Sequence, residues 1–342
     1  MDDGLQMRVH GDASLPTLFY LPGLHGDWTL VSSFRAAIAG RVRFVEFTYP
    51  RTITWTLDDY ARELEARLLA EGIDRGWLLG ESFGSQPAWQ IVKRFQDRQR
   101  SQYEPGPTPN PSEAGSRHPD AFGRFPSPPS RRAIAPLRRD GGWEGSGVGL
   151  SVKNVSAGFQ PQALILADGF VRHPVIWGVR MAGRVSSAIP MWGVKLFCVV
   201  YARYAKFRHK HAPETLASVG EFVVNRTVEP DRRAIVHRYR LIAGNDLRPV
   251  ARKTLFPVFY LAGLVDPIVP WCYVRWWLRR NCPGYRGGKT MWRADHNVLG
   301  TAPQRSAGQI QAWIADSKIE QTGKQPAEGE FDSPASGSVE PR

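Results

Sequence analysis

Short apolar runs alternate with longer amphipathic stretches over the first third of the chain. The runs at residues 17–21, 42–47 and 76–79 have the length of buried strands, and Pro22-Gly23 ends the first of them. Residues 28–39 and 56–71, which lie between these runs, have the pattern of helices. Strands that alternate with helices of this length predict a parallel sheet with right-handed crossovers.

The stretch 56–71 has the strongest helix signal. Its apolar side chains fall on one face at helical spacing: Leu57, Tyr60, Ala61, Leu64 and Leu68. Thr56 followed by Asp59 resembles a capping box at the start, and Gly72 is a natural stop. This helix therefore has both ends defined by the sequence.

The pattern breaks after Phe95. Residues 96–160 are rich in proline, glycine, serine and arginine and have few periodic apolar positions. A stretch of this length without elements of its own is unusual inside a compact domain, so we predict a disordered surface insertion after a core segment at 1–95. A proline-rich ligand for a partner module and a translated segment that is not native are the alternatives.

Core signals resume with a strand at 161–168. A basic block at 169–252 follows, with helices expected at 175–185, 191–208, 213–225 and 231–243. Because this block stands between two strands of the sheet, we expect it to form a helical lid. Residues 253–317 complete the core, with strands expected at 256–262 and 290–292 and helices at 271–280 and 303–317. The polar tail at 318–342 is expected to be disordered.

The net positive charge of the chain indicates which classes of binding partner to consider. The chain of 342 residues is 42% hydrophobic and carries a formal net charge of +13. Basic residues are concentrated between 171 and 252 among aromatic residues, which indicates a membrane surface or an acidic ligand. A solvated basic surface is the plainer alternative. Since the chain has no nucleic-acid-binding motif, we expect no nucleic-acid partner.

Three features that the sequence lacks bear on the location of the protein and on its cofactors. The first residues have neither the basic start nor the apolar stretch of a secretory signal, and the apolar stretch at 189–202 is too short to span a bilayer. Cys198, Cys272 and Cys282 do not have metal-ligand spacing. We therefore expect a cytoplasmic protein without a metal or another cofactor.

The segment Gly80-Glu81-Ser82-Phe83-Gly84 has the clearest chemical signal. An apolar run precedes it and a helix start follows it, which is the strand–turn–helix setting of a nucleophile elbow. Glycines are needed there because a side chain two residues before or after the serine would collide across so sharp a turn. A serine hydroxyl is a poor nucleophile at neutral pH, so Ser82 needs a base, an acid that orients the base, and oxyanion donors.

Two further candidates follow strand ends later in the chain. Asp266 comes after the strand at 256–262, and His296 comes after the last short strand. The carboxyl ends of parallel strands meet at one edge of a sheet, where functional groups gather. The order Ser82, Asp266, His296 is that of one hydrolase architecture. Asp168 is a rival for the acid, and a helix cap and a surface loop are the plainer interpretations of Asp266 and His296.

The oxyanion donors are expected from two backbone N–H groups. One belongs to Phe83, which directly follows the serine, and the other to Leu24 in the loop after the first long strand. Gly23 lets that loop approach closely. His25 is expected to line the pocket or to cap the following helix.

These motifs resemble the α/β-hydrolase superfamily. Leu21-Pro22-Gly23-Leu24 is similar to its oxyanion loop, residues 80–84 to its elbow, residues 263–270 to its acid loop, and Asp295-His296 to its histidine loop. The resemblance covers about residues 16–315 apart from the insertion, and the chain is most similar to carboxylesterases of the pimeloyl-ACP methyl ester esterase-like kind. It implies an α/β-hydrolase fold, with a mostly parallel central sheet flanked by helices and a helical lid.

The basic lid and the insertion depart from that family pattern and leave the substrate open. Trp177 and Trp192 are expected to line a pocket for an acyl chain, with basic residues near an anionic head group or carrier. Packing of these aromatic residues on the core is the plainer alternative. The lid is also the part of the chain expected to make any peripheral contact with a membrane.

Together these features predict a serine hydrolase that cleaves a carboxylic ester or thioester, with a free or carrier-bound acyl group. Ser82, Asp266 and His296 are the expected catalytic residues. The alternatives are a carbon–carbon hydrolase or acyltransferase that uses the same triad, and a non-catalytic or membrane-docking protein that retains the fold.

Overall fold

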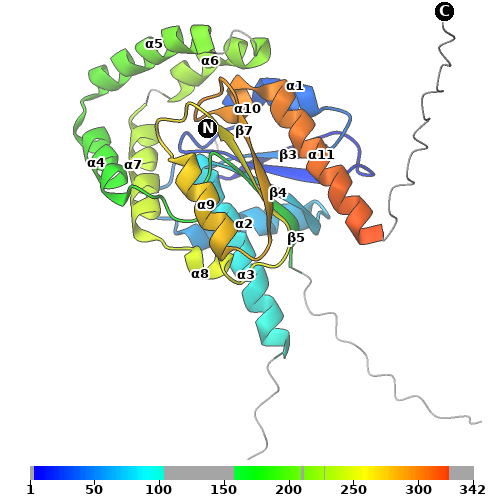
Figure 1. The fold of residues 1–342 in the computed structure, drawn as a ribbon. Helices are drawn as coiled ribbons and strands as arrows, with labels where there is room; N and C mark the ends of the chain where they lie inside the picture. The colour runs from blue at the N-terminus through cyan, green and yellow to red at the C-terminus, as the bar shows by residue number, and fades with distance from the viewer. Residues whose placement is uncertain (1–3, 104–157, 209–211, 227, 323–342) are drawn as a thin grey trace, which may run out of the picture. The chain divides into compact units, whose positions relative to one another are not determined.

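One mostly parallel sheet forms the centre of the fold (Figure 1). The structure is a computed structural model, and it describes residues 4–103, 158–208, 212–226 and 228–322. Within these residues the sheet has the order β1-β3-β2-β4-β5-β6-β7, and every neighbouring pair is parallel except β1 and β3. Its strands are β1 Gln6–His10, β2 Thr17–Leu21, β3 Arg43–Thr48, β4 Arg75–Glu81, β5 Gln160–Ala167, β6 Val258–Gly263 and β7 Tyr285–Met291. The predicted mostly parallel central sheet is confirmed.

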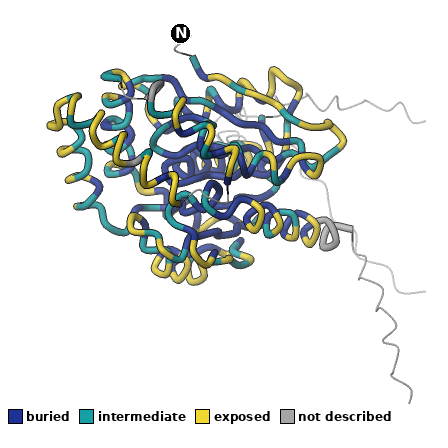
Figure 2. The backbone as a smooth tube through the Cα atoms, turned by 90° about the horizontal axis from the view of Figure 1, so that it is seen from above, coloured by how far each residue is buried: buried dark blue, intermediate teal, exposed yellow. Residues whose placement is uncertain are grey.

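Helices cover both faces of the sheet. One face packs against α1 (Ser32–Ile38) and α11 (Pro303–Thr322), and the other against α2 (Leu57–Ala70), α3 (Ser85–Tyr103) and α9 (Trp271–Asn281). Alternate residues of β2 enter the two cores, since Leu18 and Tyr20 face α1 while Phe19 and Leu21 face α2. The buried strands at the centre are visible in Figure 2. This burial on both faces explains why the core strands are continuous apolar runs.

A set of helices lies between β5 and β6 in the chain. It comprises α4 (Ile176–Ala188), α5 (Met191–Arg208), α6 (Pro213–Arg226) and α7 (Glu229–Gly244), which we call the cap, followed by the short α8 (Arg248–Ala251). In the cap α4 packs on α7 and α5 packs on α6. The helix α6 also packs on α1 and on the short helix η1 (Thr29–Val31). The cap is therefore anchored beside the loop that follows β2.

The chain divides into two compact units. Residues 1–98 and 158–342 form the first unit, which contains the sheet and the cap. Residues 99–157 form the second, and only 99–103 of it are described, as the end of α3. The predicted insertion at 96–160 lies outside the described residues over 104–157, and so does the predicted tail over 323–342.

Two helices are longer than the apolar pattern predicted. The helix α3 runs eight residues past Phe95, and α11 continues to Thr322. Within the extension of α3, Arg98 donates to Glu65 of α2 at 3.0 Å, a polar contact that the apolar pattern does not indicate.

The two edge strands also differ from the predictions. The last strand, β7, begins at Tyr285 instead of residue 290, because two glycines and two basic residues hide its alternation. The first strand, β1, pairs antiparallel with β3 and was not predicted, since its side chains are largely exposed or half-buried at the sheet edge. Edge strands lack the continuous apolar signal on which the prediction relied.

Candidate active site

The predicted nucleophile elbow is a sharp turn between β4 and α3. Ser82 begins a short 3-10 helix, η2 (Ser82–Gly84), and has a φ of +49°, an unusual value for a residue other than glycine. A Cβ on Gly84 would lie 2.0 Å from the carbonyl oxygen of Leu21, and one on Gly80 would lie 2.7 Å from the Cα of Ser85. Both positions therefore require glycine, for the steric reason inferred from the sequence.

Ser82, His296 and Asp266 form a continuous hydrogen-bonded chain. The Nε2 atom of His296 lies 2.8 Å from the Oγ atom of Ser82, and its Nδ1 atom lies 2.9 Å from the Oδ2 atom of Asp266. With the ring proton on Nδ1 and donated to the carboxylate, Nε2 accepts the hydrogen bond of the serine hydroxyl. The structure thus brings together three residues that the sequence places after the ends of β4, β6 and β7.

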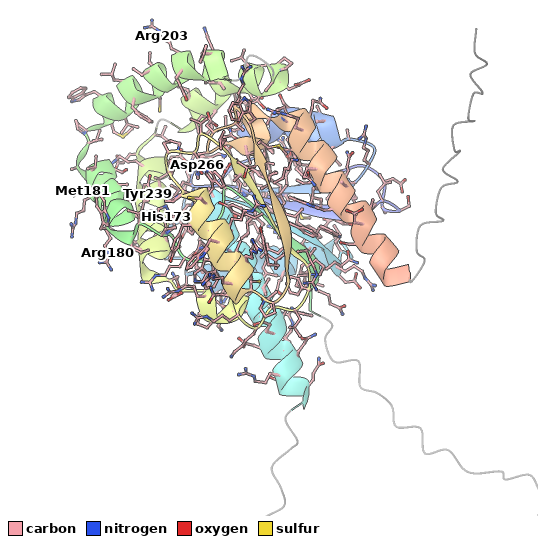
Figure 3. The ribbon with its side chains drawn as sticks, viewed as in Figure 1. His173, Arg180, Met181, Arg203, Tyr239 and Asp266 are labelled. Atoms are coloured by element: carbon pink, nitrogen blue, oxygen red, sulfur yellow. The ribbon has the colours of Figure 1, made fainter. Side chains whose placement is uncertain are left out.

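The Asp266 carboxylate is held from both sides. Its Oδ1 atom accepts hydrogen bonds from the backbone N–H groups of Ile268 at 2.7 Å and Val269 at 3.0 Å. The Asp266 side chain is fully buried, whereas that of His296 is 19% exposed. Asp266 lies on the side of the sheet that bears the cap (Figure 3). A buried carboxylate fixed in this way can orient an imidazole and stabilise its protonated form.

Asp168, the rival acid, has a different set of partners. Its Oδ1 atom accepts from the N–H of Gly263 at 2.8 Å, and its Oδ2 atom accepts from the N–H of Val298 at 3.1 Å. The side chain thus connects the end of β5 with β6 and with the short helix α10 (Val298–Thr301). Burial raises the pKa of Asp168 well above its usual value, and the charge of Asp266 adds to the rise. Among the described residues, the acid bonded to His296 is Asp266.

The loop after β2 lies against the serine. A Cβ built on Gly23 would lie 3.5 Å from the Cβ of Ser82, so the backbone there makes the close approach predicted from Gly23. The His25 ring packs edge-on against Phe222 of α6, with 5.6 Å between the ring centroids. Phe83 is fully buried. The assignment of the Leu24 and Phe83 N–H groups as oxyanion donors stays a prediction.

Arg238 of α7 supports this loop and was missed by the sequence analysis. Only 1% of it is exposed, and it donates to the carbonyl oxygens of Leu24 at 2.7 Å and Pro50 at 3.1 Å. Its guanidinium also lies 6.0 Å from the centre of the Phe83 ring. The spacing of Arg238 from the buried Ala234 and Ile242 was the available signal, because it places the arginine on the inner face of α7.

A second missed group directly precedes Ser82 in the chain. Glu81 is almost fully buried and accepts a hydrogen bond from the hydroxyl of Tyr20. Burial raises the pKa of Glu81 to about 7, and the charge of Asp295 opposes ionisation further. The elbow therefore contains a carboxyl group that titrates near neutral pH.

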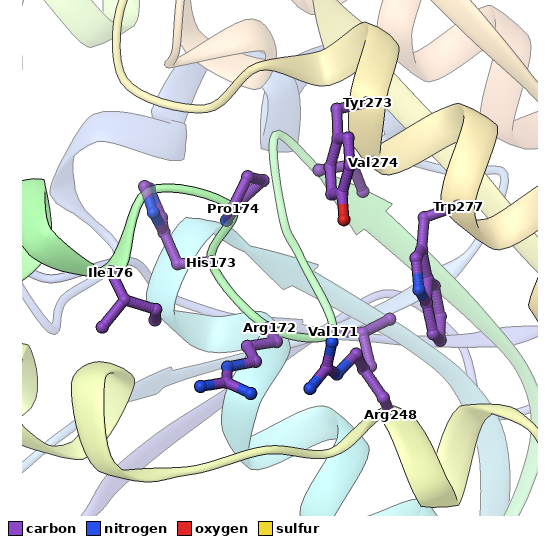
Figure 4. Close-up of a pocket in the computed structure, with 9 residues that line it drawn as sticks. All are labelled: Val171, Arg172, His173, Pro174, Ile176, Arg248, Tyr273, Val274 and Trp277. Atoms are coloured by element: carbon purple, nitrogen blue, oxygen red, sulfur yellow. The ribbon is translucent and has the colours of Figure 1, made fainter.

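A cavity of about 220 Å³ lies between the loop after β5 and the helices α8 and α9 (Figure 4). Its walls come from the loop after β5, the start of α4, α8 and α9: Val171, Arg172, His173, Pro174, Ile176, Arg248, Tyr273, Val274 and Trp277. Burial lowers the pKa of His173, and the charge of His296 adds to the lowering. The cavity is smaller than the roughly 300–1,000 Å³ of most ligand pockets, so it suits a short group.

The two tryptophans predicted to line a pocket lie elsewhere. Trp177 on α4 is 74% exposed and Trp192 on α5 is 71% exposed, and neither lines the cavity. Their role in a pocket wall stays a prediction, because the apolar pattern of a helix does not show which of its faces is covered. Within the described part of the chain, no group of three His, Cys, Asp or Glu side chains is placed to hold a metal ion.

Comparisons with known proteins agree with this architecture. No family model matches the chain, and no curated relative matches it. Several solved structures match the chain. An esterase from Thermogutta terrifontis has a TM-score of 0.58 at 15% identity, over 92% of this chain and 93% of that one. A hydrolase from Pseudomonas aeruginosa PA01 has a TM-score of 0.60 at 13% identity, over 92% and 96%.

An α/β-hydrolase enzyme named MGS-M2, from a Medee basin deep-sea metagenome library, has a TM-score of 0.58 at 9% identity, over 96% of this chain and 97% of that one. At such identities the likeness establishes the fold, and the narrower resemblance to pimeloyl-ACP methyl ester esterase-like proteins stays a prediction. The order of the strands, the elbow after β4 and these structural neighbours together show that the chain has the α/β-hydrolase fold.

Proposed function

We propose that this protein is a serine hydrolase that cleaves a carboxylic ester or thioester through an acyl-enzyme on Ser82. The observation that supports this most directly is the hydrogen-bonded chain from Ser82 through His296 to Asp266. The names of two structural neighbours, an esterase and a hydrolase, agree with it.

In the proposed reaction Ser82 Oγ attacks the carbonyl carbon while His296 Nε2 takes the hydroxyl proton. Asp266 holds the Nδ1–H tautomer and stabilises the imidazolium that forms. The backbone N–H groups of Leu24 and Phe83 donate to the oxyanion of the tetrahedral intermediate. Collapse of the intermediate expels the alcohol or thiol, which takes the proton back from His296. Water then attacks the acyl-enzyme by the same route and releases the acid.

The cavity lined by His173 supports the proposal that one group of the substrate is small. The cavity beside His173 has a volume of about 220 Å³, and its apolar walls include Pro174, Ile176 and Val274. We propose that it takes a short acyl or alcohol group. Whether the acyl group is free or carrier-bound is decided by a screen that includes both simple esters and acyl thioesters.

The experiment is hydrolysis of p-nitrophenyl esters and acyl thioesters of graded chain length. Wild type and the exposed control Ser14→Ala are expected to turn over at least one short ester, whereas Ser82→Ala and His296→Ala are expected to lose at least about 10³-fold in kcat. Equal activity in Ser82→Ala would remove the assignment. If the protein turns over no ester or thioester but cleaves a carbon–carbon bond or transfers an acyl group, a carbon–carbon hydrolase or an acyltransferase with the same triad is favoured.

A further inference from the structure

The outer face of α5 exposes a largely apolar surface. Six side chains between 49% and 71% exposed lie on it: Trp192, Leu196, Phe197, Val199, Val200 and Tyr204. Projected at 3.6 residues per turn, they share one sector of about 160°. Ala205, on the opposite side, is fully buried against Leu30 and Val219. A helix that is apolar all round is normally covered on every side, yet only one side of α5 is covered in the cap.

The charges on this face have a single sign. No aspartate or glutamate occurs between residues 176 and 208. Lys195 and Lys206 lie along one border of the apolar sector and Arg203 lies within it. All three are exposed, and among the described residues none of them is in an ion pair. Figure 3 shows Arg203 on the outer side of α5, with Arg180 and Met181 on the outer side of the neighbouring α4.

This combination fits an interfacial helix. Such a helix buries its apolar face at the boundary between headgroups and acyl chains, while its Lys and Arg side chains reach the anionic headgroups. Trp192 and Tyr204 are of the side-chain types that favour this boundary. Within the described residues no single helix is long and apolar enough to cross a membrane. The helices α4 and α5 pass that criterion only as a pair, which is bent by 116°.

We propose that α5 is a docking surface for an anionic lipid bilayer. Apolar side chains without a protein partner and cations without acidic partners are the two features that such a surface requires. The helix lies next to α6, whose Phe222 contacts His25 in the loop beside Ser82. The docking surface is thus one helix away from the candidate site. Docking does not depend on hydrolysis.

The test is co-sedimentation of the full chain with vesicles of phosphatidylcholine, with or without phosphatidylserine. We expect binding to the anionic vesicles that weakens with salt. Lys195→Glu with Lys206→Glu is expected to lower the partition coefficient by about 25-fold or more, at about fivefold for each base. The matched control is Lys253→Glu with Lys289→Glu, which reverses two exposed bases elsewhere and is expected to bind as wild type.

A second pair of variants tests the apolar part. Leu196→Ser with Val200→Ser is expected to lower the partition coefficient at least about tenfold, whereas Leu255→Ser with Ile53→Ser, which are also exposed apolar residues, is expected to have no effect. Ser82→Ala is expected to bind vesicles as wild type, so loss of hydrolysis and loss of docking are separate results. The proposal is overturned if anionic vesicles do not sediment the protein. It is also overturned if Leu196→Ser with Val200→Ser abolishes a concentration-dependent dimer and leaves lipid binding intact.

Discussion

Replacing Asp266 and Asp168 by asparagine separates the acid that orients His296 from the acid that holds the strand ends. In Asp266→Asn the amide oxygen can still accept from the N–H groups of Ile268 and Val269. The amide NH₂ then faces Nδ1 of His296, which must accept and therefore carries its proton on Nε2. A histidine in this tautomer cannot take the proton of Ser82.

The expected magnitude follows from that tautomer. A Ser-His-Asp enzyme with an asparagine in place of its aspartate loses about 10⁴-fold in kcat, which is about 5 kcal/mol of transition-state stabilisation. We expect a loss of this size for Asp266→Asn with little change in stability. In Asp168→Asn the NH₂ group instead faces one of two buried backbone N–H groups. This is expected to cost about 1–3 kcal/mol of unfolding free energy.

The assay is p-nitrophenyl ester hydrolysis at saturating substrate, with urea unfolding of both variants in parallel. For Asp168→Asn, kcat per folded molecule is expected to stay within a few-fold of wild type. The reasoning is refuted if Asp168→Asn loses orders of magnitude in kcat while Asp266→Asn keeps its activity.

Three further predictions concern the surroundings of Ser82. Arg238→Met leaves the carbonyl of Leu24 without its buried donor, so we expect kcat to fall at least about tenfold and stability to fall by about 3 kcal/mol; Arg238→Lys should recover part of both in the same assays. Glu81 keeps its proton up to about pH 7 in the folded state and to about 4.5 when unfolded. The contribution of Glu81 to stability should therefore fall as the pH rises between these values, by up to about 3 kcal/mol, and Glu81→Gln should remove this contribution in urea unfolding across that range. Gly84→Ala places a Cβ against the carbonyl of Leu21, and we expect it to lose about 3 kcal/mol of stability; denaturation with an unchanged midpoint would contradict this.

The central part of the fold was predictable because several signals agree. The apolar runs before Pro22 and before Gly80 are buried on both faces of the sheet, and α2 begins at the predicted capping box of Thr56 and Asp59. The elbow was predictable for a steric reason, since its two glycines leave no space for a Cβ. Apolar runs, helix caps and turn glycines depend on residues that are close in the chain, so they can be recognised from the sequence alone.

The parts that could not be predicted depend on contacts between distant residues. Asp168 and Asp266 both follow strand ends, and only the paths of the following loops decide which one reaches His296. Arg238 lies more than two hundred residues after Leu24, and nothing in the local sequence links them. The exposure of Trp192 was not predictable, because the apolar pattern of α5 does not reveal which side packs on α6.

The most direct test of the central claim is the site of covalent labelling by a fluorophosphonate, read by intact mass and peptide mapping. The account predicts one adduct per chain, on Ser82, formed rapidly in wild type and strongly slowed in His296→Ala. It also predicts no adduct in Ser82→Ala. Labelling that persists unchanged in Ser82→Ala, or that maps to another serine, would contradict the assignment of Ser82 as the nucleophile.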